Sequence, residues 1–262
     1  MARSAGRAAS GPPRGPGDIV KLDGRVALVT GAGRRVGRAI ATSLGERHMK
    51  VAVHYHGSAE GARETGAAIE TAGGEAMLFQ ADLSDPRGPD ALVDAVARAF
   101  GALDVLVNSA AIMQRTPIES VTPAEWDATF ALNARAPFFT ALAARRYLAE
   151  RGGAIVNIAD LAALETWPAY IPHGLSKSVV VQMTRALARA LAPSIRVNAV
   201  APGVVMLPEG WDPSAGERLR QTTPLRRLGS ANDVVGAVIY LLEADYVTGE
   251  TLVVDGGRHI RK

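Results

Sequence analysis

The sequence predicts an α/β fold in which a doubly wound parallel sheet of about seven strands carries helices on both faces. Short apolar runs alternate with longer segments of helical periodicity, and a glycine-rich turn joins the first run to the first helical segment. Each of the first six runs is followed by a loop and a helical segment, as in right-handed β-α-β connections. The strand candidates are residues 25–30, 51–55, 76–80, 105–108, 154–158, 196–200 and 251–254.

The composition indicates one large domain. A chain of 262 residues with 48% hydrophobic content can bury a substantial core, and we assign residues 21–262 to a single domain. Residues 1–20 form an extension rich in Arg, Ala, Ser, Gly and Pro, which we expect to be disordered. A transit peptide is the alternative for this extension, although its Pro-Pro and Gly-Pro steps disfavour an amphipathic helix.

The composition also limits the partners. The formal net charge is +3, of which the three arginines and one aspartate of the extension supply +2, and no basic helix points to nucleic acid. Because the chain has no cysteine, disulfides, thiolate catalysis and Cys-ligated metals are excluded, and a reducing compartment such as the cytoplasm is expected. Charged residues or glycine interrupt every apolar run before about 18 residues, so we expect no membrane span. No metal site is expected.

The first predicted helix begins in the glycine-rich loop Gly31-Ala32-Gly33-Arg34-Arg35-Val36-Gly37. Gly31 permits a tight turn, and Gly37 lets the helix pack closely on the strand. The free N–H groups at the start of the helix suit a pyrophosphate, so the loop predicts a Rossmann-like dinucleotide site. A cation in the first turn of a helix is unfavourable without an anion, and we therefore expect Arg35 to contact a phosphate. The predicted cofactor contacts in this loop are Gly31, Arg34, Arg35, Val36 and Gly37.

The end of the second predicted strand favours NADPH as the cofactor. Sites that select NAD usually place an acidic residue here, to accept from the ribose 2′-hydroxyl. This chain has His54-Tyr55-His56-Gly57-Ser58 instead. His56 and Ser58, with Arg34 across the cleft, suit a 2′-phosphate. His54 is expected to be a partly buried strand residue.

Candidate catalytic residues follow the fifth predicted strand. Asp160 comes directly after this strand, and His173 precedes Lys177 by four residues, which places both side chains on one side of a helix. Tyr170 lies one helical turn before His173. An aspartate at the end of a strand is also a common helix N-cap, so a catalytic role and a capping role both stay open for Asp160.

Taken together, these motifs resemble the short-chain dehydrogenase/reductase family over about residues 22–260. In that family a serine precedes a Tyr-x-x-x-Lys pair. The resemblance implies that Asp160 replaces the serine and that His173 replaces the tyrosine, while Lys177 still holds the cofactor ribose. Asn133 corresponds to an asparagine that distorts its helix and holds a proton-relay water. Further implied cofactor contacts are Asp82 and Leu83 at the adenine, Asn108, Ser109 and Ala110 at the nicotinamide ribose, and Pro202 and Gly203 at the nicotinamide.

Three local features resemble the pteridine and dihydromonapterin reductases: Arg35, the His-Tyr-His-x-Ser loop, and Asp160 in the place of serine. The resemblance implies hydride transfer from NADPH to a pterin-like ring. A carboxylate within about 4 to 6 Å favours an imidazolium, so Asp160 and His173 are predicted to act together as the proton donor. The loop 204–223 is predicted to cover the substrate through Met206, Leu207 and Trp211.

Three alternatives stay open. The substrate could be a ketone or a ketoacyl group rather than a pterin, and Tyr170 could supply the missing phenol. The chain could also bind NADPH without reducing anything, as a sensor or a partner subunit. The family resemblance further implies a small-molecule substrate and a homotetramer.

Overall fold

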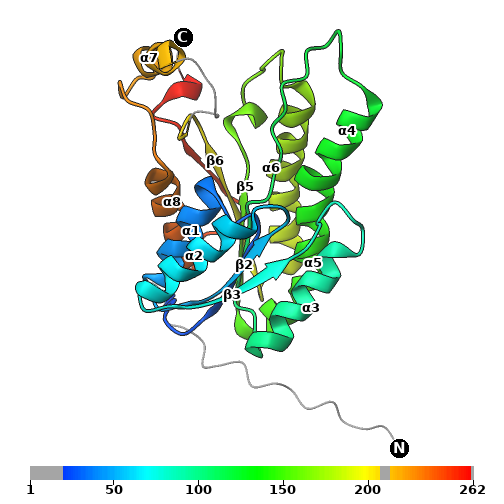
Figure 1. Cartoon of the computed structure of the whole chain (residues 1–262), viewed down its shortest axis with the longest axis vertical. Coiled ribbons are helices and arrows are strands. Elements are labelled where there is room, and N and C mark those ends of the chain that lie inside the picture. Colours follow the sequence, from blue (N-terminus) through cyan, green and yellow to red (C-terminus); the bar gives the residue numbers. More distant parts are fainter. Residues whose placement is uncertain (1–19, 207–212, 261–262) are drawn as a thin grey trace, which may run out of the picture.

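Seven parallel strands form a single sheet in the computed structural model, which describes residues 20–206 and 213–260 (Figure 1). The predicted fold class is confirmed. Three strands have the predicted bounds, and the ends of the other four differ by at most two residues. The sheet order is β3-β2-β1-β4-β5-β6-β7. The strands are β1 (Val26–Val29), β2 (Lys50–Tyr55), β3 (Glu75–Gln80), β4 (Val105–Asn108), β5 (Ala154–Ile158), β6 (Arg196–Pro202) and β7 (Thr251–Val254).

Helices cover both faces of the sheet. Along β1 the side chains alternate, so that Ala27 and Val29 pack with one set of helices while Val26 and Leu28 pack with the other. One face carries α1 (Arg35–Gly45), α2 (Ala59–Thr71) and α8 (Ala231–Glu243), and the other carries α3 (Gly88–Phe100), α5 (Ala136–Arg151) and α6 (Ile171–Leu191). The described helices also include α4 (Pro123–Phe130) and α7 (Pro213–Thr222).

The strand order reverses between β1 and β4, which opens a crevice at their carboxyl ends. Thr30 joins the two loops that leave these strands. Its backbone N–H donates to the Val107 carbonyl at 3.0 Å, and its hydroxyl accepts from the N–H groups of Ser109 (2.9 Å) and Ala110 (3.1 Å). The glycine-rich loop and the loop after β4 therefore form one continuous wall of the crevice.

The first described residue is part of the packed fold. Val20 is buried, and its N–H donates to the Glu243 carbonyl at 3.0 Å. The rest of the predicted extension lies outside the described residues, as do the predicted substrate contacts Leu207 and Trp211. None of the described helices is both long and apolar enough to cross a membrane.

Candidate active site

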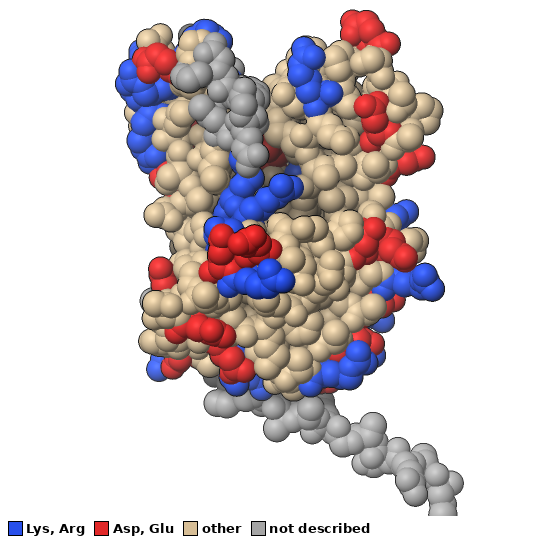
Figure 2. Space-filling model, in the orientation of Figure 1, with Lys and Arg blue, Asp and Glu red and all other residues tan. Residues whose placement is uncertain are grey.

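A cleft of about 1770 Å³ lies at the carboxyl ends of the strands. Figure 2 shows a hollow between the two upper lobes of the molecule, with basic side chains gathered below it. Most of the predicted site residues meet in this cleft. Those that line it are Gly31, Arg34, Arg35, Val36, Gly37, His56, Ser58, Asp82, Leu83, Ser109, Ala110, Asp160, Tyr170, His173, Lys177, Pro202, Gly203 and Met206.

The glycine-rich loop has the shape that a bound pyrophosphate requires. Gly31 has a φ of 67°, and a Cβ there would lie 2.9 Å from the Cα of Ala110. A Cβ on Gly37 would collide with the Gly31 carbonyl oxygen. The first turn of α1 carries no acidic residue, so its N–H groups and its positive dipole end stay available to an anion. These residues fit a dinucleotide phosphate.

Arg35 adopts a left-handed backbone conformation, with a φ of 51°. Glycine is the residue that takes this conformation without strain, so an arginine here is held in an unusual backbone conformation by its surroundings. The side chain extends across the cleft, where its Nη2 donates to the Met206 carbonyl at 3.0 Å. Arg35 therefore links the glycine-rich loop to the segment after β6. Its predicted phosphate contact stays a prediction.

His54 is fully buried rather than partly buried, and it connects two loops of the cofactor side. Its Nδ1 accepts from the Gly31 N–H at 3.1 Å, and its Nε2 faces the Ala81 carbonyl at 3.2 Å. A carbonyl only accepts, so Nε2 carries the hydrogen and the ring is neutral. Burial lowers the pKa of His54 to about 4, although the bond to Ala81 acts in the opposite direction.

This burial predicts a loss of stability in acid. Between about pH 6.5 and 4 the unfolded chain protonates His54 while the folded chain does not, so the free energy of unfolding falls as the pH drops through this range. The loss amounts to about 3 kcal/mol. We expect urea denaturation curves at pH 7, 5.5 and 4.5 to show this component in the parent. It should disappear in His54→Asn, whose side-chain oxygen can still accept from Gly31.

His48 provides the matched control for that experiment. It is exposed and has a φ of 55°, a conformation that asparagine tolerates. His48→Asn should leave the acid dependence of unfolding unchanged. An equal change in both variants would contradict the role assigned to His54.

Asp82 lies at the rim of the cleft, as predicted for a residue near the adenine. Its Oδ1 accepts from the Ser84 N–H at 2.8 Å and from the Ser84 hydroxyl at 2.6 Å. These hydrogen bonds hold the pKa of Asp82 below its usual range, so the carboxylate stays ionised. The adenine contact itself stays a prediction.

Asn108 is placed differently from its predicted role at the nicotinamide ribose. Its side chain is buried within the wall, where Nδ2 donates to Asn157 Oδ1 at 2.9 Å. Asn157 in turn donates to the Thr184 hydroxyl at 3.0 Å, so the amides join β4, β5 and α6. A buried amide needs such partners, and here they lie inside the fold. The neighbouring Ser109 and Ala110 do line the cleft.

Asn133 distorts its helix, as predicted, because Ala131–Arg135 form a π-helical turn between α4 and α5. The side chain is buried behind the cleft wall. Its Oδ1 accepts from the Ile112 N–H and its Nδ2 donates to the Ile112 carbonyl, both at 2.9 Å. Nδ2 also lies 3.1 Å from the Ser176 hydroxyl, which donates to the His173 carbonyl. Asn133 thus fixes the loop after β4 against the start of α6.

His173 and Asp160 meet at the floor of the cleft. His173 Nδ1 lies 3.1 Å from the Ile112 carbonyl oxygen and 3.4 Å from Asn133 Nδ2. Because Asn133 Nδ2 already donates to the Ile112 carbonyl and the Ser176 hydroxyl, we assign a hydrogen to His173 Nδ1, and Nε2 faces Asp160. The distance from Nε2 to Asp160 Oδ2 is 3.6 Å. The side chains are 4% and 22% exposed respectively, so the carboxylate reaches the cleft and the imidazole stands behind it. Nε2 itself is buried and has no hydrogen-bond partner among the described residues.

Asp160 also serves as an N-cap, the second role considered for it, and its catalytic role stays a prediction. Its Oδ1 accepts from the Ala162 N–H at 2.8 Å, at the start of the 3₁₀ turn Leu161–Ala163. This bond orients the carboxylate, because one oxygen is held by the backbone while the other turns toward His173.

Lys177 is buried beside this pair. Its Nζ donates to the Ile158 carbonyl at 2.8 Å. Burial lowers the pKa of Lys177 to about 8, against the charge of Asp160, which acts to raise it. The lysine is therefore mostly cationic near neutral pH, at a cost in folding free energy.

The loop between β5 and α6 adds residues that the sequence did not single out. Trp167 lines the cleft, its Nε1–H donates to Glu165 Oε2 at 2.9 Å, and Glu165 lies 3.9 Å from the guanidinium of Arg258. Tyr170 stands edge-to-face against Trp167. The sequence offered one sign that Trp167 lies near the site, because it is an aromatic residue between Asp160 and His173. The ion pair between its partner Glu165 and Arg258, near the C-terminus, could not be predicted.

Comparison with known proteins gives consistent matches over nearly the whole chain. Residues 31–259 match a family model described as enoyl-(acyl carrier protein) reductase. Versicolorin reductase stcU of Emericella nidulans is 36% identical over 257 residues, 92% of this chain and 97% of that protein. The 3-oxoacyl-(acyl-carrier-protein) reductase FabG of Staphylococcus aureus is 34% identical over 240 residues, 89% of this chain and 98% of its own. A crystal structure of a dehydrogenase/reductase from Sinorhizobium meliloti 1021 has a TM-score of 0.85 at 36% identity, and covers 91% of this chain and 97% of that one.

Proposed function

The chain belongs to the short-chain dehydrogenase/reductase family, and on that basis we propose that it is an NADPH-dependent reductase of a carbonyl compound. The observation that carries the proposal is the Asp160–His173 pair at the floor of the cleft, with a distance of 3.6 Å between the carboxylate and the imidazole. This pair can deliver a proton beside a site whose glycine loop fits a dinucleotide.

The comparisons favour a carbonyl substrate over the pterin that the sequence motifs suggested. One relative is named as a 3-oxoacyl reductase and the other as a versicolorin reductase, and neither name mentions a pterin. We therefore place the ketone or ketoacyl alternative ahead of the pterin. The homotetramer and the cytoplasmic location stay predictions.

The cofactor would lie along the wall formed by the glycine loop and the ends of β2, β3 and β4. When bound, NADPH supplies a hydride to the carbonyl carbon. The helix start at Arg35 would hold the pyrophosphate, while Arg34, His56 and Ser58 would surround the 2′-phosphate. Lys177 would bind the ribose hydroxyls.

The proton comes from the chain's own acid pair. As the carbonyl carbon gains a hydride, the electron pair of its π bond moves to the oxygen, which must take up a proton. Asp160 is the more exposed partner, so its carboxyl group is placed to contact that oxygen. His173 stands behind it, positioned by the Ile112 carbonyl, and can return a proton to the carboxylate. The rival donor Tyr170 lines the same cleft, and a Tyr170→Phe variant distinguishes it from the acid pair.

The test is NADPH oxidation by the purified chain with a panel of ketones, a ketoacyl thioester and dihydropterins. The proposal expects turnover with a carbonyl substrate. Turnover with dihydropterins alone would replace it by the pterin reductase function. NADPH binding without any turnover would leave the alternative of a sensor or partner subunit.

Cofactor preference gives a separate prediction at Arg34. A charged hydrogen bond to a phosphate contributes about 1.5 to 3 kcal/mol, so Arg34→Ala should raise the KM for NADPH by roughly tenfold to a hundredfold. The KM for NADH, which lacks the 2′-phosphate, should change much less. Arg63 is exposed on α2 and does not line the cleft, so Arg63→Ala is the matched control. Equal changes for both cofactors in Arg34→Ala would contradict the 2′-phosphate contact.

A further inference from the structure

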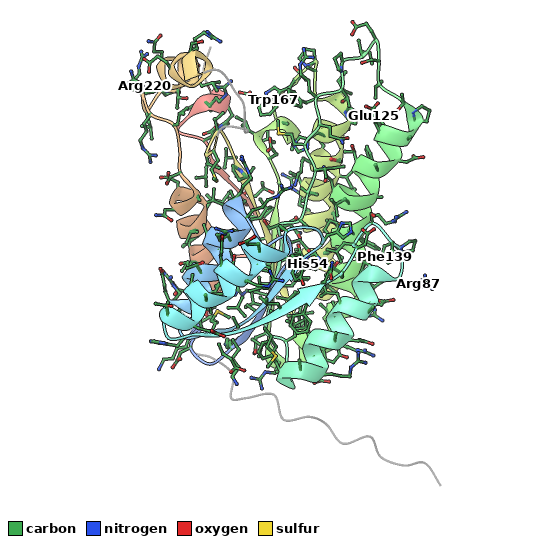
Figure 3. All side chains as sticks on the ribbon, viewed as in Figure 1. His54, Arg87, Glu125, Phe139, Trp167 and Arg220 are labelled. Atoms are coloured by element: carbon green, nitrogen blue, oxygen red, sulfur yellow. The ribbon has the colours of Figure 1, made fainter. Side chains whose placement is uncertain are left out.

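The wall of the cleft beyond Asp160 is an aromatic corner, formed by Trp167 and Tyr170. Their ring centroids are 6.3 Å apart and their planes meet at 78°. Both side chains are half-buried and line the cleft. In Figure 3 the labelled Trp167 lies between the lobe that carries α7 and the lobe that carries α4. The corner thus occupies the position from which a substrate would reach Asp160.

Trp167 lines this space with its N–H group already engaged within the fold. The Nε1–H is already held by Glu165 at 2.9 Å, and Glu165 lies 3.9 Å from Arg258. This chain of contacts fixes the indole between the loop after β5 and the segment after β7. A fixed indole whose donor is engaged offers an apolar, electron-rich surface, which suits the face of another aromatic ring.

The corner is close to the reacting groups. Tyr170 is the residue directly before α6, and His173 lies in the first turn of that helix, about 4.5 Å further along the axis. A fused ring system in the corner would therefore extend over the floor where Asp160 meets His173. A carbonyl group built into such a ring would lie within reach of the carboxyl group.

Two exposed methionines complete the surroundings. Met113 and Met206 are 43% and 40% exposed, and both line the cleft. Thioethers make favourable contacts with aromatic rings and adapt to their shape. A flexible aliphatic acyl chain would gain less from these surfaces, because stacking requires a planar ring and a chain loses rotamer freedom when it is ordered.

We propose that the Trp167–Tyr170 corner selects planar, fused-ring aromatic ketones over flexible aliphatic ketoacyl groups. This inference rests on the proposed carbonyl reductase function and names its substrate class.

The test compares α-tetralone with acetoacetyl-CoA as substrates of the parent, Trp167→Leu, Trp167→Phe and Trp126→Leu. Trp126 is a partly exposed tryptophan on α4 that does not line the cleft, so the same substitution there is the matched control. We expect kcat/KM of the parent to be higher for α-tetralone. In Trp167→Leu it should fall about tenfold, mainly through KM, while the value for acetoacetyl-CoA stays nearly constant. Trp167→Phe should keep most of the parent's kcat/KM for α-tetralone, and Trp126→Leu should leave this value unchanged.

A second readout is the affinity of the NADP-bound protein for α-tetralone, measured by thermal shift. Two results would overturn the proposed selectivity of the corner and leave the reductase function intact. One is an equal loss for both substrates in Trp167→Leu. The other is a parent that reduces acetoacetyl-CoA but not α-tetralone. If neither ketone is reduced, the kinetic comparison is lost, and the reductase function is decided by the wider substrate panel. The affinity then decides alone: a weaker affinity in Trp167→Leu supports the corner, and an unchanged one overturns it.

Discussion

Removal of the His173 imidazole is expected to lower kcat by about 10² to 10⁴, which is the usual contribution of a positioned acid. His173→Asn is the sharpest variant. Its side-chain N–H can still donate to the Ile112 carbonyl, as His173 Nδ1 does at 3.1 Å, but nothing replaces Nε2 beside Asp160. Asp160→Asn should cause a loss of similar size, because the amide cannot pass on a proton. Single-turnover rates at saturating NADPH provide the measurement.

Two controls separate this mechanism from its rivals. Tyr170→Phe should retain most of the activity. If instead Tyr170→Phe loses activity while His173→Asn keeps it, the proton donor is the Tyr170 phenol. A large gain of activity in His173→Tyr over a barely active parent would support the non-catalytic alternative. Unchanged NADPH affinity in each variant shows that the fold of the site is retained.

Replacement of Lys177 by methionine is expected to lower kcat/KM by about a hundredfold or more and, at the same time, to stabilise the fold. The buried ammonium would no longer orient the cofactor ribose or balance the Asp160 charge. The stabilising effect follows because burial lowers the pKa of Lys177 to about 8, which means that folding works against the charged form. Methionine has a similar length and no charge to bury. Steady-state kinetics and urea denaturation at pH 7.5 test both effects on one sample.

The pH dependence of unfolding identifies the origin of this gain. Below about pH 8 both the folded and the unfolded chain carry the ammonium. Between about 8 and 10.5 only the unfolded chain binds the proton, so the free energy of unfolding of the parent rises with pH by up to about 3 kcal/mol. Lys177→Met should lack this rise, and Lys21→Met, at an exposed lysine, should keep it. A parent and a Lys177→Met variant with parallel alkaline profiles would contradict the buried charge.

Local patterns in the sequence were sufficient for the sheet and for the cofactor loop. Alternating apolar runs report which segments are buried on both faces, and the seven predicted strands were all observed. The placement of Gly31 and Gly37 follows from backbone geometry alone, since a Cβ at either position would meet backbone atoms. The four-residue spacing of His173 and Lys177 likewise fixed both on one side of α6.

Other features depended on contacts between distant segments. The family resemblance implied that Asn108 is a cofactor contact, but its amide is satisfied by Asn157 inside the wall. His54 looked like an ordinary strand residue, yet it holds the Gly31 N–H of another loop. A polar side chain at a strand end can turn into the cleft or into the fold. The available hydrogen-bond partners decide which, and they come from other elements.

Patterns along the chain were enough to predict the parallel sheet, the dinucleotide loop and the placement of His173 and Lys177 on one side of a helix, because these depend on periodicity, glycine geometry and helical spacing. The place of Asp160 beside them was implied by the family resemblance. Only the tertiary structure decided that Asp160 faces the cleft at 22% exposure while His173 stands behind it at 4%. The same packing brought Trp167, Glu165 and Arg258 together beside the cleft. The physical reason is that exposure and side-chain partners are set by packing between loops from different strands, and such packing leaves no periodic signal in the chain.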